Sequence, residues 1–229
     1  MIDAALPHAP LAGVDDVERL RGLIAAMGGL AEAQLERALA ALRHDDRESA
    51  RTVVANDAGL DAMERRAGEL IAAILLPGLA DAAALREVLA AHRIAGLIER
   101  VGDYAKTVAR RLPLVELAGG GEPVRLVGRL GGRVRELLRQ ALDAFAARDA
   151  DAALSVCAHD REVDELYRAV TVALTDRMMR VPGDVPACSE LLLMAKTLER
   201  VGDQATNIAE LVFQARRGHP APDRHAAAA

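Results

Sequence analysis

The sequence predicts an all-α protein, a tandem repeat of two three-helix bundles whose six long helices are related by a pseudo-twofold. Composition, apolar spacing and a duplicated motif support this fold class. Of the 229 residues, 52% are apolar but only 2% are aromatic, and tryptophan is absent. The core must therefore consist of Ala, Leu, Val, Ile and Met, which favours helices over strands.

Apolar residues recur at the spacing of one helix face along most of the chain. Pro and Gly mark the ends of the segments at Pro77-Gly78, Pro113 and Val181-Pro182-Gly183. The expected helices are 14–44, 47–76, 80–112, 124–148, 149–180 and 186–217. The expected units are a disordered N-terminus at 1–13, bundles at 14–113 and 123–217, a linker at 114–122 and a disordered tail at 218–229.

The second half of the chain repeats the first. The motif Glu-Arg-Val-Gly-Asp at 99–103 recurs unchanged at 199–203. Upstream, equivalent residues lie 103 positions apart, and the pair Gly28-Gly29 returns as Gly131-Gly132. Each glycine costs a helix interior about 1 kcal/mol relative to alanine. The repeated pairs therefore indicate either a close helix crossing or a point that bends.

Charge and motif content exclude several classes of function. The net charge of −5, with no basic cluster among aromatics, argues against nucleic-acid binding. No apolar run approaches the ~20 residues of a membrane helix and no signal peptide is evident, so a soluble chain that is not secreted by this route is expected. Cys157 and Cys188 lack CxxC spacing and are expected to be buried thiols. Without a nucleotide-binding loop, HExxH or a Ser-His pair, the protein is not expected to be an enzyme.

Acidic residues spaced i, i+4 are the candidate metal ligands. In each half one pair lies in the last helix of the bundle and another in the helix before it, at equal sequence distances from the turn between them. Antiparallel pairing thus places four carboxylates side by side, which repel one another unless protons, basic side chains or a cation intervene. The candidates are Asp57, Asp61, Glu99, Asp103, Asp160, Asp164, Glu199 and Asp203.

Other interpretations of this region stay open. The carboxylates could instead form solvated helix faces. Arg100 and Arg200 lie about 100° round the helix from the preceding glutamates and are expected to flank the acidic face. Gly102 and Gly202 permit close approach of either a helix or a hydrated ion. His159 is either a further ligand or a surface histidine.

The duplicated motif, its extension from Glu199 to Asn207, and Ala84-Leu85-Arg86 resemble the PhoU family over residues 14–217. The resemblance implies a tandem pair of three-helix bundles in a cytoplasmic, homodimeric accessory protein, peripheral at the inner membrane through its partners. Such a protein negatively regulates phosphate uptake and phosphate-starvation signalling by contact with the phosphate ABC transporter and its histidine kinase.

The resemblance also implies divalent or trivalent metal ions (iron, zinc, manganese or magnesium) at the eight carboxylates. Two positions depart from the family pattern. Thr107 stands where the second repeat has Asn207, and Ala84 replaces the usual Asp. The second site is therefore expected to hold metal more firmly than the first.

Two other functions remain compatible with the sequence. A PhoU-like accessory of a divalent-cation or phosphate permease would share every feature above. A di-metal carboxylate enzyme in a helical bundle would use Glu-x-x-His pairs. Gly102 and Gly202 occupy the third positions after Glu99 and Glu199, which argues against the enzyme.

Overall fold

The computed structural model describes residues 14–55, 58–79, 81–116 and 121–222, and these form α-helices and short 3-10 turns without any strand. The all-α prediction is confirmed. The first half contains α1 (Val14–His44), α2 (Arg47–Ala55), α3 (Ala58–Leu75), α4 (Ala82–Arg111) and η1 (Leu112–Leu114). The second half contains α5 (Glu122–Ala147), α6 (Ala150–Ala158), α7 (Asp160–Arg180), η2 (Pro182–Asp184) and α8 (Val185–Arg217).

The fifth expected helix, 149–180, is divided at His159 into α6 and α7, so the single-helix prediction was wrong there. The His159 ring Nδ1 lies 2.7 Å from the Ser155 carbonyl oxygen and donates to it. This carbonyl would accept the α-helical hydrogen bond of residue 159, and the His159 amide instead donates to Val156. Asp160 is consequently the first residue of α7.

The second expected helix, 47–76, corresponds to α2 and α3. Residues 56–57 between these helices lie outside the described part of the chain, as do the expected N-terminus 1–13 and the end of the expected tail, 223–229. Helix α1 has the bounds that the apolar spacing predicts.

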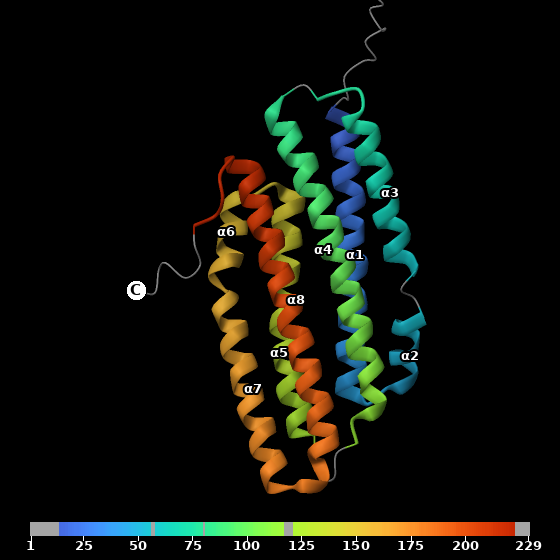
Figure 1. The fold of residues 1–229 in the computed structure, drawn as a ribbon, viewed down its shortest axis with the longest axis vertical. Coiled ribbons are helices and arrows are strands. Elements are labelled where there is room, and N and C mark those ends of the chain that lie inside the picture. The colour runs from blue at the N-terminus through green and yellow to red at the C-terminus, as the bar shows by residue number, and fades with distance from the viewer. Residues whose placement is uncertain (1–13, 56–57, 80, 117–120, 223–229) are drawn as a thin grey trace, which may run out of the picture.

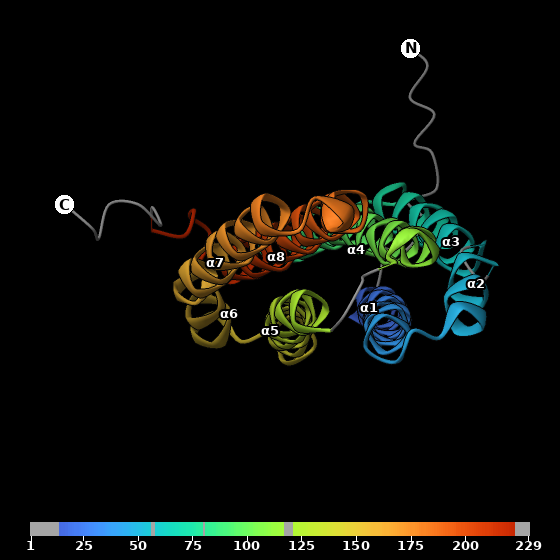
Figure 2. The same ribbon diagram turned by 90° about the horizontal axis from the view of Figure 1, so that it is seen from below.

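The two halves pack side by side over a shared core (Figure 1). Seen along the helices, α3, α4, α8 and α7 form one row, and α1 and α5 lie below it (Figure 2). Helix α4 contacts α8, and α1 contacts α5, so these four central helices join the bundles. None of the helices in the described part of the chain is long and apolar enough to cross a membrane. Cys157 and Cys188 are buried and form no disulfide.

The glycine pairs lie where α1 crosses α5, and their contacts are reciprocal. A Cβ built on Gly28 would lie 2.6 Å from Leu142 Cδ2, and one built on Gly131 would lie 2.2 Å from Leu39 Cδ2. Gly131 is the repeat equivalent of Gly28, and Leu142 that of Leu39, so the pseudo-twofold relates these two contacts. Of the two interpretations of the glycine pairs, the close crossing is the one found.

Replacing Gly131 with alanine is expected to lower the free energy of unfolding by about 1–3 kcal/mol, because the added methyl group meets the fully buried Leu39. Gly132→Ala is the matched control. A Cβ there meets nothing within 4 Å, so the better helix former should raise stability by up to ~1 kcal/mol. Urea unfolding followed by circular dichroism measures both. Equal stabilisation by the two substitutions would contradict a tight crossing.

Candidate metal-binding site

The second acidic group consists of Asp160 and Asp164 on α7 and Glu199 and Asp203 on α8, two helices in contact. Burial raises the pKa of Asp203 to about 6, helped by the negative charges of Glu199, Asp160 and Asp164 and opposed by Lys196. The other three predicted side chains thus lie near enough to Asp203 to raise its pKa. Asp164 is exposed, and the other three are half-buried.

Lys196 provides the second acidic group with a positive charge of its own. Its Nζ lies 2.7 Å from each carboxylate oxygen of Glu199. The same ammonium group stands 5.4 Å from the centre of the Tyr167 ring. The hydrogen bond to Glu199 is the main reason that the pKa of Lys196 is raised. Any cation entering between Glu199 and its neighbours must compete with this ammonium group.

Thr206 holds the Asp160 carboxylate in place. Its hydroxyl donates to Asp160 Oδ1 at 3.0 Å and approaches the Gly202 carbonyl oxygen at 3.2 Å. Thr206 is fully buried, so this contact fixes the start of α7 against α8. The first repeat has Lys106 at the equivalent position.

The first acidic group consists of Asp61 and Glu64 on α3 and Glu99 and Asp103 on α4. Burial raises the pKa of Glu99, and the charges of Asp103, Glu64 and Asp61 raise it further, whereas Arg100 lowers it. Three of the predicted residues are thus brought together, while Asp57 lies outside the described residues. Glu64 was missed by the sequence reasoning, although it follows Asp61 by one helical turn.

The motif glycines serve helix packing. A Cβ on Gly102 would lie 2.3 Å from Leu60 Cδ1, and one on Gly202 would lie 3.1 Å from Val163 Cγ1. Leu60 and Val163 are repeat equivalents on α3 and α7. The absence of a side chain at these glycines therefore lets the helices of each acidic group approach closely, with one apolar side chain packed against each glycine.

The carboxylates of each group interact electrostatically but are not arranged as the ligands of a metal ion. In the described part of the chain no three His, Cys, Asp or Glu side chains stand close enough to hold one ion. The donors are nevertheless of the right kind, since carboxylate oxygens suit hard cations. The neighbouring carboxylates help to raise the pKa of Asp203, and a bound cation would neutralise their negative charge. The carboxylates of the second group are thus of a kind that suits a hard cation, but as they stand, with Lys196 paired to Glu199, they do not surround a common point.

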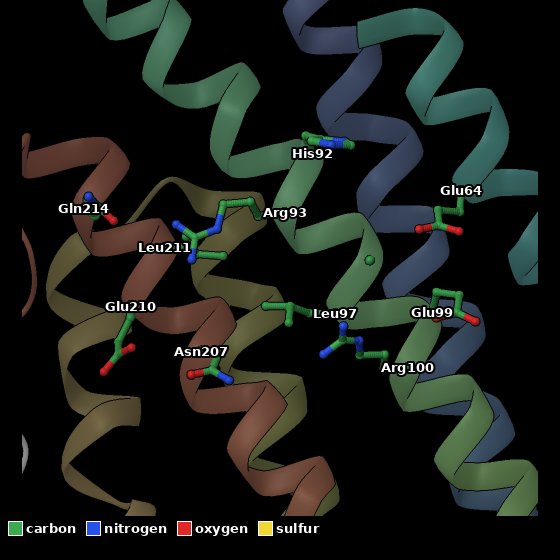
Figure 3. Close-up of a pocket in the computed structure, with 11 residues that line it drawn as sticks. Glu64, His92, Arg93, Leu97, Glu99, Arg100, Asn207, Glu210, Leu211 and Gln214 are labelled. Atoms are coloured by element: carbon green, nitrogen blue, oxygen red, sulfur yellow. The ribbon is translucent and has the colours of Figure 1, made fainter.

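A cleft of about 610 Å³ opens beside the first acidic group, between α4 and α8 (Figure 3). Asn207, one turn after Asp203 on α8, lines this cleft. Arg100 points toward α8 and Glu99 toward α3 (Figure 3). The arginine therefore flanks the acidic face as predicted. The remaining lining residues are Glu64, His92, Arg93, Gly96, Leu97, Glu210, Leu211 and Gln214.

In the absence of metal, Asp203→Asn is expected to stabilise the protein near neutral pH. The folded state holds the Asp203 proton more tightly than the unfolded state, since the pKa rises from 3.8 to about 6. The stabilisation from this proton is complete below pH ~4 and is lost as pH rises through ~6. The gain from Asp203→Asn should therefore be greatest above pH ~6.5 and vanish towards pH ~4, measured by urea unfolding with a chelator present. Asp164→Asn, on an exposed carboxylate of the same group, should give a smaller gain, because its charge contributes least to the raised pKa of Asp203. A gain independent of pH would contradict the assignment.

Each half of the chain matches one family profile. Residues 24–112 and 127–212 both match the PhoU domain. The chain belongs to the PhoU family. It is 41% identical over 217 residues to the phosphate-specific transport system accessory protein PhoU homolog of Zymomonas mobilis, covering 95% of this chain and 92% of that protein. The homolog from Caulobacter vibrioides is 39% identical over 203 residues, covering 86% of each chain.

Solved PhoU structures have the same architecture. The crystal structure of PhoU from Pseudomonas aeruginosa superposes with a TM-score of 0.83 at 36% identity, covering 90% of this chain and 99% of that one. The phosphate transport system regulatory protein PhoU from Streptococcus pneumoniae gives a TM-score of 0.82 at 22% identity, covering 90% of this chain and 98% of that one. The second likeness shows the fold alone. Together with the two domain matches, these structures confirm the predicted tandem of bundles.

Proposed function

We propose that this PhoU chain is an accessory protein of a phosphate transport system, acting on the cytoplasmic side as a negative regulator of phosphate uptake and starvation signalling. The observation that carries the proposal is the 41% identity to a phosphate-specific transport system accessory homolog across 95% of the chain. The protein would act by contact rather than by turnover. Its partners would be the phosphate ABC transporter, the sensor histidine kinase and a second copy of itself.

Metal binding by the acidic groups is the second part of the proposal. A bound cation would supply positive charge between facing helices. In the second group, Asp160 is already held by Thr206, and Glu199 and Asp203 lie across from it on α8. Lys196 would leave Glu199 when the cation binds. Binding would therefore lock α7 against α8 and leave the ammonium group free for another anion.

The role of Lys196 follows from its position. Without metal, its ion pair with Glu199 reduces the repulsion that raises the pKa of Asp203. The first repeat has Gly96 at this position, and Glu64 stands where the second repeat has Tyr167. The two acidic groups are thus differently balanced, and they are expected to differ in cation affinity.

A reporter experiment tests the regulatory proposal. A strain lacking this protein should express a phosphate-starvation promoter in phosphate-rich medium, because the negative regulation of starvation signalling is lost. Returning the wild-type gene should silence the reporter, whereas Glu199→Gln/Asp203→Asn should restore silencing only in part. Gly132→Ala, on the exposed α5 surface, is the matched control and should silence fully. If neither the reporter nor phosphate uptake changed on deletion, the proposal would fail and a permease for divalent cations would become the better client.

A further inference from the structure

Helix α5 carries five arginines between positions 125 and 139, and the fold uses only the last three as ion-pair partners. These pairs, at 2.8, 2.7 and 2.7 Å, are Arg133 with Glu162, Arg135 with Glu36 and Arg139 with Glu136. The first two arginines, Arg125 and Arg129, are exposed, and within the described part of the chain neither forms an ion pair or a hydrogen bond. Two guanidinium groups of α5 are therefore left without a counter-ion.

The two unpaired arginines line a cleft of about 530 Å³ between the last turn of α1 and the first two turns of α5. These helices lie side by side below the row formed by the other long helices (Figure 2). Arg125 and Arg129 are four residues apart, which places their β-carbons about 6 Å apart on one face of α5. Arg43 of α1 also lines the cleft, and its Cγ would lie 3.7 Å from a Cβ built on Gly128. Three arginines thus converge on one opening.

Positive charge exceeds negative charge in this cleft. Glu122 is the one carboxylate among its described lining residues, and it pairs with neither of the two α5 arginines. Arg43 is bound to Glu36 at 2.8 Å, but the second oxygen of Glu36 is bound to Arg135 at 2.7 Å. One negative charge therefore serves two arginines. The cleft keeps an excess of positive charge that no residue lining it balances.

The internal repeat shows that bundle packing does not require these arginines. In α1, the residues equivalent to the two unpaired arginines, 103 positions earlier, are Gly22 and Ala26. In α5, the residue equivalent to Arg43 is Ala146. The same helix therefore forms in the other repeat with small side chains at all three positions. The basic cleft is a property of one end of the α1–α5 pair alone.

We infer that the cleft between α1 and α5 binds a phosphate group, held by Arg125, Arg129 and Arg43. Guanidinium groups hold phosphate through paired, charge-assisted hydrogen bonds. A phosphate group offers several oxygens to two guanidinium groups at once, whereas a carboxylate offers only two. The ligand is a small phosphate-bearing molecule or the head group of an anionic phospholipid, since both present this chemistry.

The inference does not rest on the proposed function, because it follows from the arginines themselves. The cleft also shares no lining residue with either acidic group. Purified full-length protein is first freed of metal with a chelator and then dialysed, so that phosphate cannot bind through a metal ion. Titration calorimetry with inorganic phosphate tests the first source of the ligand. Sedimentation with phosphatidylcholine vesicles, with and without phosphatidylglycerol, tests the second. Binding should weaken as the salt concentration rises.

Three variants decide whether the cleft is the site. Arg125→Gln/Arg129→Gln should weaken binding of the probe at least ~10-fold, because both unpaired guanidinium groups are lost. Arg65→Gln/Arg66→Gln removes the same charge from the exposed surface of α3 and should leave binding unchanged. Glu122→Gln should tighten binding about 2–5-fold, because it removes the carboxylate that repels the ligand. Thermal melts confirm that each variant folds.

The two probes also identify the source of the phosphate group. Binding of inorganic phosphate that needs Arg125 and Arg129 supports the inference with a small molecule as ligand. Binding of phosphatidylglycerol vesicles alone, with the same dependence on these arginines, supports it with a lipid head group. Binding of neither probe, or an equal effect of the two double substitutions, would overturn the inference.

Discussion

Replacing Arg177 with alanine is expected to lower the free energy of unfolding by about 3 kcal/mol, the largest effect on stability anticipated for any single side chain outside the apolar core. Arg177 Nε and Nη2 lie 2.6 and 2.5 Å from Asp184 Oδ2. The Asp184 side chain is only 1% exposed, so the substitution leaves a buried charge without its main counter-ion. Denaturant unfolding with circular dichroism detection measures the loss.

Two companion variants separate this effect from a general loss of surface charge. Arg180→Ala removes an exposed arginine that pairs with Asp176 one turn earlier on the same helix, and should cost less than ~1 kcal/mol. Arg177→Ala/Asp184→Asn removes the buried charge as well and should recover much of the loss. A drop as small as that of Arg180→Ala would show that water reaches Asp184 in the folded protein.

The second large effect concerns Lys196 and metal. Lys196→Met is expected to increase cation affinity at the second acidic group, because the competing ammonium group is gone. The same variant should be less stable than wild type without metal, since repulsion around Asp203 grows. Saturating metal at ~100 times its dissociation constant should stabilise the protein by about 2.7 kcal/mol. Titration calorimetry gives the affinities, and unfolding with and without chelator gives the stabilities.

Lys106→Met is the matched control for this experiment, since it removes a lysine from α4 beside the first acidic group. It should leave the affinity of the second group unchanged. If Lys196→Met destabilised the protein equally with and without metal, Lys196 would be a permanent counter-ion and no cation would replace it.

Most of the fold followed from sequence because local signals and tertiary packing agree. Apolar spacing predicted α1, and Pro182-Gly183 marked the turn between α7 and α8. The division at His159 was missed because buried residues at helical spacing, Val156 and Val163, continue across it without glycine or proline. It depends on one ring-to-carbonyl hydrogen bond, which no periodicity reveals.

The candidate site was predictable only where the two repeats agree. The sequence repeat made the carboxylate pairs recognisable, and the structure brings together those pair members that it describes. Three residues of these groups were missed: Glu64, Lys196 and Thr206. Each lies at a position where the repeats differ, since the equivalent residues of the other repeat are Tyr167, Gly96 and Lys106. A search for repetition passes over such positions, although they adjust the charge of each group. Firmer metal binding by the second repeat stays a prediction, and Asn207, on which it relied, lines the cleft between α4 and α8.

The most direct test of the central claim, that the duplicated carboxylates hold cations, is the metal content of the purified protein by native mass spectrometry. Wild-type protein dialysed against Mn²⁺, Fe³⁺ or Zn²⁺ should retain metal. Glu199→Gln/Asp203→Asn should lose the share held by the second group, and Glu99→Gln/Asp103→Asn the share held by the first. Asp143→Asn/Asp151→Asn, which changes two exposed carboxylates outside both groups, should lose none. Equal metal content in all four proteins, or none in any, would contradict the claim and leave the carboxylates as solvated helix faces.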